Sequence, residues 1–121
     1  SMDIVSQRAI QVDLTLLQDL IAMSEGDDLH TYSSLIASDL DRHMSNLAVG
    51  VQSADTSLKS EALHGIYQVA ASFGLTSVLQ YTGALQDTTK EPEQRLESDH
   101  VHQLQQIIDH SLQWIRQQRL R

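Results

Sequence analysis

The sequence predicts an all-α fold: an antiparallel four-helix bundle of up-down-up-down order, with a short additional helix at the N-terminal end. Apolar residues recur every three or four positions along most of the chain, which is the spacing of one face of an α-helix. The 121 residues include one Pro and five Gly, too few for a fold rich in turns. Aromatic residues make up 4% of the chain, so Leu, Ile, Val and Ala must form most of the core.

The first two helices are expected in the N-terminal half. The first spans 13–25, where Asp13 is suited to cap the start and Gly26 to close the end. Its apolar residues at helical spacing are Leu14, Leu17 and Ile21. The second spans 28–52 and takes Asp27 or Asp28 as its cap. Its apolar residues are Leu29, Tyr32, Ile36, Leu40, Met44, Leu47 and Val51.

Three further helices follow a polar break at 52–57, "QSADTS". The third helix is expected at about 56–73, ended by Gly74, and the fourth at about 75–88. The segment "DTTKEPEQ", 87–94, is the expected loop, with Pro92 as the helix breaker. The last helix is expected at about 94–119. The expected core faces of these helices are Leu58, Ala62, Ile66, Val69 and Phe73; Leu75, Val78, Leu79, Thr82 and Leu85; and Val101, Leu104, Ile108, Ser111, Leu112 and Ile115.

The chain shows no internal repeat and no linker, so we expect a single domain over 3–121. Ser1 and Met2 have the character of residues left by cloning and are set aside. No apolar run approaches the ~20 residues that cross a bilayer, and no signal peptide is visible. A cytoplasmic location is therefore expected, with no direct membrane contact by this domain.

The charge balance argues against nucleic acids and anionic membranes as partners. Eight basic and sixteen acidic residues give a net charge of −8, whereas nucleic acids and anionic membranes are bound through stripes of Lys and Arg. The basic residues gather in the C-terminal "IRQQRLR", where they complement the helix dipole. The absence of Cys excludes disulfides, thiolate catalysis and cysteine metal sites. No nucleic-acid partner is expected.

One histidine stands out in the third helix, in "EALHGIYQVAASFGL", 61–75. At about 100° per residue, the apolar residues of this helix fall within one sector, and His64 lies roughly 200° from its centre. His64 is therefore expected on the outer face, away from the core. The other expected members of that face are Ser60, Tyr67, Gln68 and Ala71.

The remaining histidines make a poor metal site. His100 and His102 are two residues apart and point in different directions on a helix. His43 precedes a core Met, and His30 and His110 stand alone on polar faces. No H-E-x-x-H, P-loop, G-x-S-x-G or G-x-G-x-x-G motif occurs, so the sequence gives no sign of an ordinary hydrolase or nucleotide-binding site.

With these features the chain resembles the histidine-containing phosphotransfer (HPt) domains of bacterial multistep phosphorelays. That family carries an exposed His on the third helix, followed by x-x-Lys-Gly and by a second Gly ten residues after the His. His64 and Gly74 have this spacing in "HGIYQVAASFG". The resemblance covers nearly the whole chain, since 12–53 looks like the family's first two helices and "LTSVLQYTGALQ" like the helix after the second glycine.

The chain departs from the family pattern beside His64. Tyr67 replaces the family's Lys and Gln68 replaces its Gly, so a cationic side chain and an open surface are both missing. Tyr67 offers only a neutral hydrogen bond to a phosphoryl group, weaker than one from Lys. Gln86 falls where family members carry a Gln beside the histidine, and Ala70 and Ala71 are expected to keep part of the surface flat.

The resemblance implies a phosphocarrier that accepts a phosphoryl group from a receiver-domain aspartate on His64 and passes it to another receiver. It implies no cofactor in this chain, because Mg²⁺ belongs to the receiver. It also implies a phosphocarrier rather than a stand-alone enzyme, either free-standing or the terminal module of a hybrid sensor histidine kinase. Three alternatives stay open: a degenerate HPt domain that docks a receiver without transfer, a plain helical interaction module, and a metal-binding bundle. Neither the receiver nor the oligomeric state can be read from the sequence.

Overall fold

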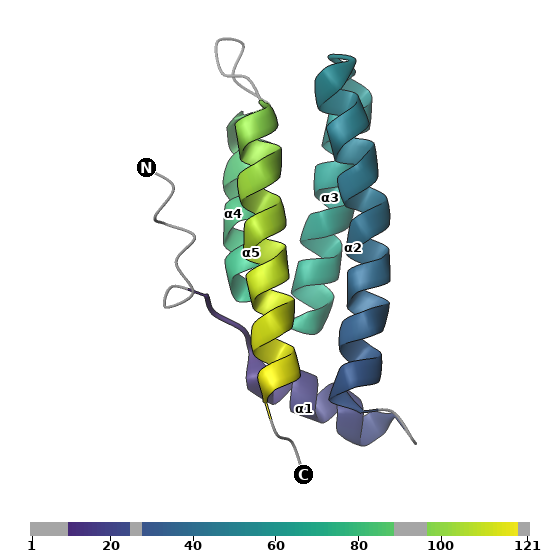
Figure 1. The fold of residues 1–121 in the computed structure, drawn as a ribbon, viewed down its shortest axis with the longest axis vertical. Helices are drawn as coiled ribbons and strands as arrows, with labels where there is room; N and C mark the ends of the chain where they lie inside the picture. Colours follow the sequence, from purple (N-terminus) through teal and green to yellow (C-terminus); the bar gives the residue numbers. More distant parts are fainter. Residues whose placement is uncertain (1–9, 25–27, 89–96, 119–121) are drawn as a thin grey trace.

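A computed structural model describes residues 10–24, 28–88 and 97–118, without the side chain of Thr88. It contains five helices: α1 (Leu14–Met23), α2 (Leu29–Gln52), α3 (Thr56–Phe73), α4 (Thr76–Thr88) and α5 (Ser98–Gln117). No strand occurs in these ranges, so the all-α prediction is confirmed. In Figure 1, α2 to α5 run side by side and α1 lies across their lower ends. This packing is compatible with the expected four-helix bundle.

Short polar residues start the helices where the sequence leads one to expect them. Asp13 and Asp28 accept hydrogen bonds from the backbone N–H groups of Leu16 (3.1 Å) and Thr31 (2.7 Å). The bond to Thr31 lowers the pKa of the exposed Asp28 carboxyl below its usual value, because it favours the charged form. Asp55 caps α3 in the same way, through the N–H of Leu58 at 3.0 Å. Each cap satisfies one of the backbone donors that a helix start leaves unpaired.

Gly74 ends α3 as expected, and it does so in the left-handed conformation, with φ of 72°. A side chain there would be strained and would also lie against Asp13, since an added Cβ would be 2.9 Å from the Asp13 Cβ. The same glycine accepts a hydrogen bond from the backbone N–H of Asp13 at 2.7 Å. Gly74 therefore stops α3 and also joins the start of α1 to the end of the helix that carries His64.

Several boundaries differ from the expected ones. The first helix ends at Met23, where Ser24 leaves the helical conformation, and not at 25. The last helix ends at Gln117, two residues early, because Gln118 is extended. At the start of that helix the backbone N–H of Glu97 donates to Nδ1 of His100 at 3.0 Å. Gly26, Asp27, Pro92 and most of the basic C-terminal cluster lie outside the described residues.

The core follows most of the expected faces of α2, α4 and α5, but it is displaced on α3. On the first three of these helices the predicted core residues that are only half-buried are Leu29, Val51, Leu79 and Val101, and Gln103 and Ile107 of α5 are buried without having been predicted. Leu63 and Ala70 are buried, although the periodicity favours Leu58 and Val69, which are only half-buried. The expectation that Ala70 would flatten the surface is therefore wrong. The displacement is roughly 50° around the helix axis. It arises because α3 packs against α2 on one side and α4 on the other, so its buried face lies between the two.

Two glycines show how α2 and α3 pack. An added Cβ on Gly50 would approach the backbone of Lys59 within 3.0 Å, and one on Gly65 would meet the ring of His43. From His43 to Gly50, α2 advances by seven residues, while the positions opposite on α3 go back by six, from Gly65 to Lys59. The two helices are therefore antiparallel.

Within the described ranges, no helix is apolar and long enough to cross a membrane.

Candidate functional site

His64 lies on α3 with its side chain exposed, as the periodicity of that helix predicts. Ser60 and Gln68, one turn before and after it, are also exposed, and so is Ala71 two turns on. Two residues beyond His64, Ile66 is fully buried and anchors the helix in the core. The histidine therefore stands on a rigid element with a free approach from solvent.

Tyr67 borders His64 on the side of α4. Its side chain is 37% exposed, and its Cε2 atom lies 3.6 Å from the place of an added Cβ on Gly83. The tyrosine ring therefore lies beside Gly83, at the border between α3 and α4.

The Tyr67–Gly83 contact also fixes how α3 lies along α4. α3 and α4 are antiparallel and are joined at Gly74. The residue three positions before Tyr67 on α3 is therefore level with the residue three positions after Gly83 on α4. This register brings Gln86 to the level of His64. Gln86 is half-buried, as expected for a residue at the border between two helices.

On the side of His64 that faces α2, the structure places His43, which the sequence did not indicate as part of the site. His43 of α2 is half-buried, and its ring lies over Gly65, the residue next to His64. An added Cβ on Gly65 would lie no more than 2.8 Å from Cε1, Nδ1 and Nε2 of that ring. A glycine inside a helix costs about 0.5–1 kcal/mol relative to Ala, and the close approach of His43 is its structural reason.

This close approach predicts a strong coupling between positions 43 and 65. Gly65→Ala is expected to lower the free energy of unfolding by about 1 kcal/mol, because the new methyl group displaces the imidazole. With His43→Ala present, the same change is expected to raise it by about 0.5–1 kcal/mol, because Ala favours the helix. Denaturant unfolding of the two single variants and the double variant measures the coupling. Additive effects would contradict the contact.

The outer face of α2 carries two exposed aliphatic side chains, Leu35 and Val49. Both lie seven residues from Arg42, which is two helical turns, so the three share one face. Arg42 Nη2 lies 3.7 Å from Oδ1 of Asp39, a pair largely open to solvent. Because Arg42 precedes His43, this ion pair is near the level of His64, and the aliphatic residues lie about 10 Å above and below it.

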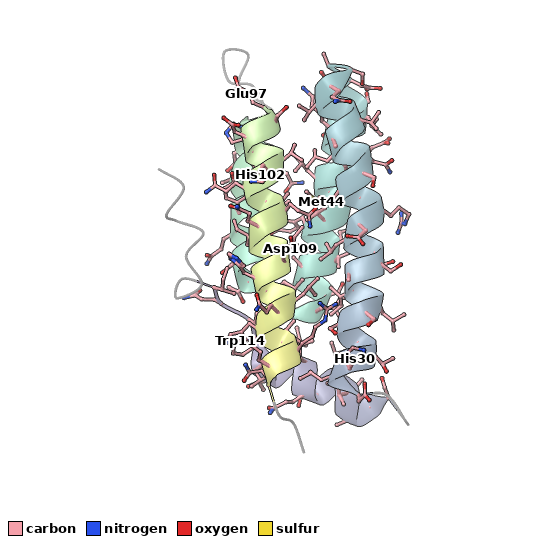
Figure 2. All side chains as sticks on the ribbon, in the orientation of Figure 1. His30, Met44, Glu97, His102, Asp109 and Trp114 are labelled. Atoms are coloured by element: carbon pink, nitrogen blue, oxygen red, sulfur yellow. The ribbon has the colours of Figure 1, made fainter. Side chains whose placement is uncertain are left out.

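The other histidines do not join this site. Figure 2 shows His30 near the lower end of α2 and His102 on the upper half of α5. His100 is engaged at the start of α5, and Nε2 of His102 lies 3.4 Å from the side-chain nitrogen of Gln106. In the part of the chain that the structure describes, no three His, Asp or Glu side chains form a group able to hold a metal ion.

Two other features lie away from His64. Trp114 on α5 is half-buried and packs against the core. A groove of about 680 Å³ lies between α2 and α5, next to Met44 and His102, which Figure 2 labels. Its lining side chains come from those two helices and include Val49, so the groove adjoins the outer face of α2.

The comparisons give no family for this chain. Searches against models of known protein families, curated proteins and solved structures find no match.

Proposed function

We propose that this chain is a histidine phosphotransfer domain, an up-down-up-down four-helix bundle with His64 as its phosphoacceptor. The observation that carries the proposal is the exposure of His64 on a helix held in the core from its opposite face. Gly74 supports it, since it ends the same helix ten residues later in a left-handed conformation. The level of Gln86 along α4 supports it further.

Phosphoryl transfer requires only a nucleophile from this domain. A receiver carries an aspartyl phosphate, and the neutral imidazole of His64 attacks the phosphorus with the lone pair of one ring nitrogen. The P–O bond to the aspartate breaks and its electron pair returns to the carboxylate, while the second ring nitrogen keeps its proton. A second receiver takes the group by the reverse exchange. The receiver supplies Mg²⁺, so this domain needs no cofactor, only an exposed and oriented nucleophile.

The receiver would dock on the outer faces of α2 and α3. Tyr67, Gln68 and Ala71 lie beside His64 on α3. Leu35 and Val49 on α2 offer exposed apolar surface around a central ion pair, the composition of a small interface with an apolar part and a polar part. Such a domain would work in the cytoplasm, alone or within a larger sensor kinase.

One observation favours a second candidate, a degenerate domain that docks a receiver without transfer. The family's Lys is replaced by Tyr67, whose ring packs over Gly83. That side chain gives no positive charge to a phosphoryl group on His64. We favour the working carrier because the nucleophile itself is kept and accessible.

The test is phosphotransfer from a set of phosphorylated receivers to the wild-type protein. The expected product is a label that is lost in acid and stable in base, as a phosphoramidate is, and that peptide mass spectrometry assigns to His64. A receiver that binds the protein without labelling it would establish the docking module instead. Absence of both labelling and binding with every receiver would overturn the HPt assignment.

A further inference from the structure

The ring of His43 touches the backbone of the residue next to the proposed phosphoacceptor. Its contact with Gly65 is closer than any other residue type at that position would permit. His64 is the residue before Gly65 on α3, so the two lie about 100° apart around the helix axis and 1.5 Å apart along it. The imidazole of His43 therefore lies against α3 about a quarter of a turn around the helix from His64.

The cations of the neighbourhood are otherwise engaged or remote. Arg42 is paired with Asp39. Lys59 is the one Lys or Arg in α3, and it lies roughly 140° around the helix from His64 with its stem against Gly50. Tyr67, at the position of the family's Lys, is neutral. Among the residues that the structure describes, none would thus supply a dedicated positive charge to a phosphoryl group on His64.

His43 is in a state that can respond to such a group. Partial burial lowers the pKa of its imidazole below the usual 6.5, Arg42 lowers it further, and Asp39 opposes them in part. At neutral pH the neutral form of the ring therefore predominates before phosphorylation. The titratable and charged groups around it are Asp39 and Arg42 on its own helix and, on α3, His64 and Glu61, one turn before Gly65.

We propose that His43 takes up a proton from solvent when His64 is phosphorylated, so that an imidazolium faces the phosphoryl group in place of the missing lysine. The inference rests on the proposed role of His64. The reason is Coulombic: a neighbouring group with a charge near −2 favours the charged form of an imidazole. By linkage, protonation of His43 favours the phosphorylated state by the same factor. His43 is a positioning residue here, since it touches no reacting atom.

The experiment follows the imidazole resonances of His43 by NMR across the neutral pH range. His64 is phosphorylated with phosphoramidate, a small donor that needs no receiver, and the identically treated His64→Gln variant is the control. The pKa of His43 is expected to rise by roughly 0.5 to 1 unit on phosphorylation, the low end for neighbouring opposite charges, because His64 is exposed and His43 is only half-buried. The imidazole resonances of His102, which lines the groove between α2 and α5, should not change on phosphorylation.

A second pair of variants tests the same coupling without phosphorylation. His64→Asp places a permanent negative charge at the site, and His64→Asn is its neutral match. The pKa of His43 should be higher in the Asp variant than in the Asn variant, by less than on phosphorylation. In both designs, an unmoved pKa of His43 overturns this inference. Failure of every receiver to label His64 would overturn the proposed function and leave these measurements unaffected.

Discussion

Replacing His64 with glutamine is expected to abolish phosphoryl transfer from the receiver while leaving the helices folded. The amide of glutamine approximates the size and polarity of imidazole but has no nucleophilic nitrogen. Because the side chain of His64 is exposed, no core contact is lost, and the free energy of unfolding should stay within about 0.5 kcal/mol of wild type. The acid-labile label measures transfer, and circular dichroism with denaturant measures the fold.

The matched control is His102→Gln, the same substitution at an exposed position on α5. It should transfer at the wild-type rate. Undiminished labelling of the His64→Gln variant would show that the phosphoacceptor lies elsewhere, and loss of labelling in both variants would show that the effect is not specific to position 64.

Ile66→Ala is expected to lower the free energy of unfolding by about 3 kcal/mol. Ile66 is fully buried, and removing its side chain loses both hydrophobic transfer energy and packing contacts around a cavity. This is a large part of the roughly 5–15 kcal/mol that stabilises a typical domain. Urea unfolding measures the change. Transfer by the molecules that remain folded should be retained, because His64 points away from the core.

Gln68→Ala is the matched control on the same helix. Its side chain is exposed, so its effect on unfolding should be within about 0.5 kcal/mol. A decrease of less than about 1 kcal/mol in the free energy of unfolding for Ile66→Ala would contradict the burial of Ile66 in the core.

Much of the fold follows from local signals in the sequence. Asp13, Asp28 and Gly74 act as the caps that their residue types predict, because capping depends on a few adjacent backbone groups. The helix ends at Met23 and Gln117 have no such signal in the described residues, and there the predicted boundaries are wrong. The burial of Leu63 is also missed, since it depends on two neighbouring helices and not on the period of one.

The surroundings of His64 required knowledge of how the helices pair. Its exposure follows from periodicity, but the approach of His43 does not. A usable signal exists nonetheless: His43 and Gly65 lie eleven residues before and after Ala54, at the centre of the turn between α2 and α3. In an antiparallel helical hairpin, residues equally distant from the turn lie at the same level. A glycine inside α3 at that level indicates a large side chain opposite.

α3 packs against both of its neighbours in the chain, α2 and α4, and we therefore expect it to open to solvent less often than α1. Contacts between chain neighbours close short loops, and such contacts form quickly and early in folding. α3 buries four residues, whereas α1 buries only Leu17. The amide protons of α3 are therefore expected to exchange with solvent through opening of the whole domain, and those of α1 through local fraying. The backbone that carries His64 thus stays fixed from one encounter with a partner to the next.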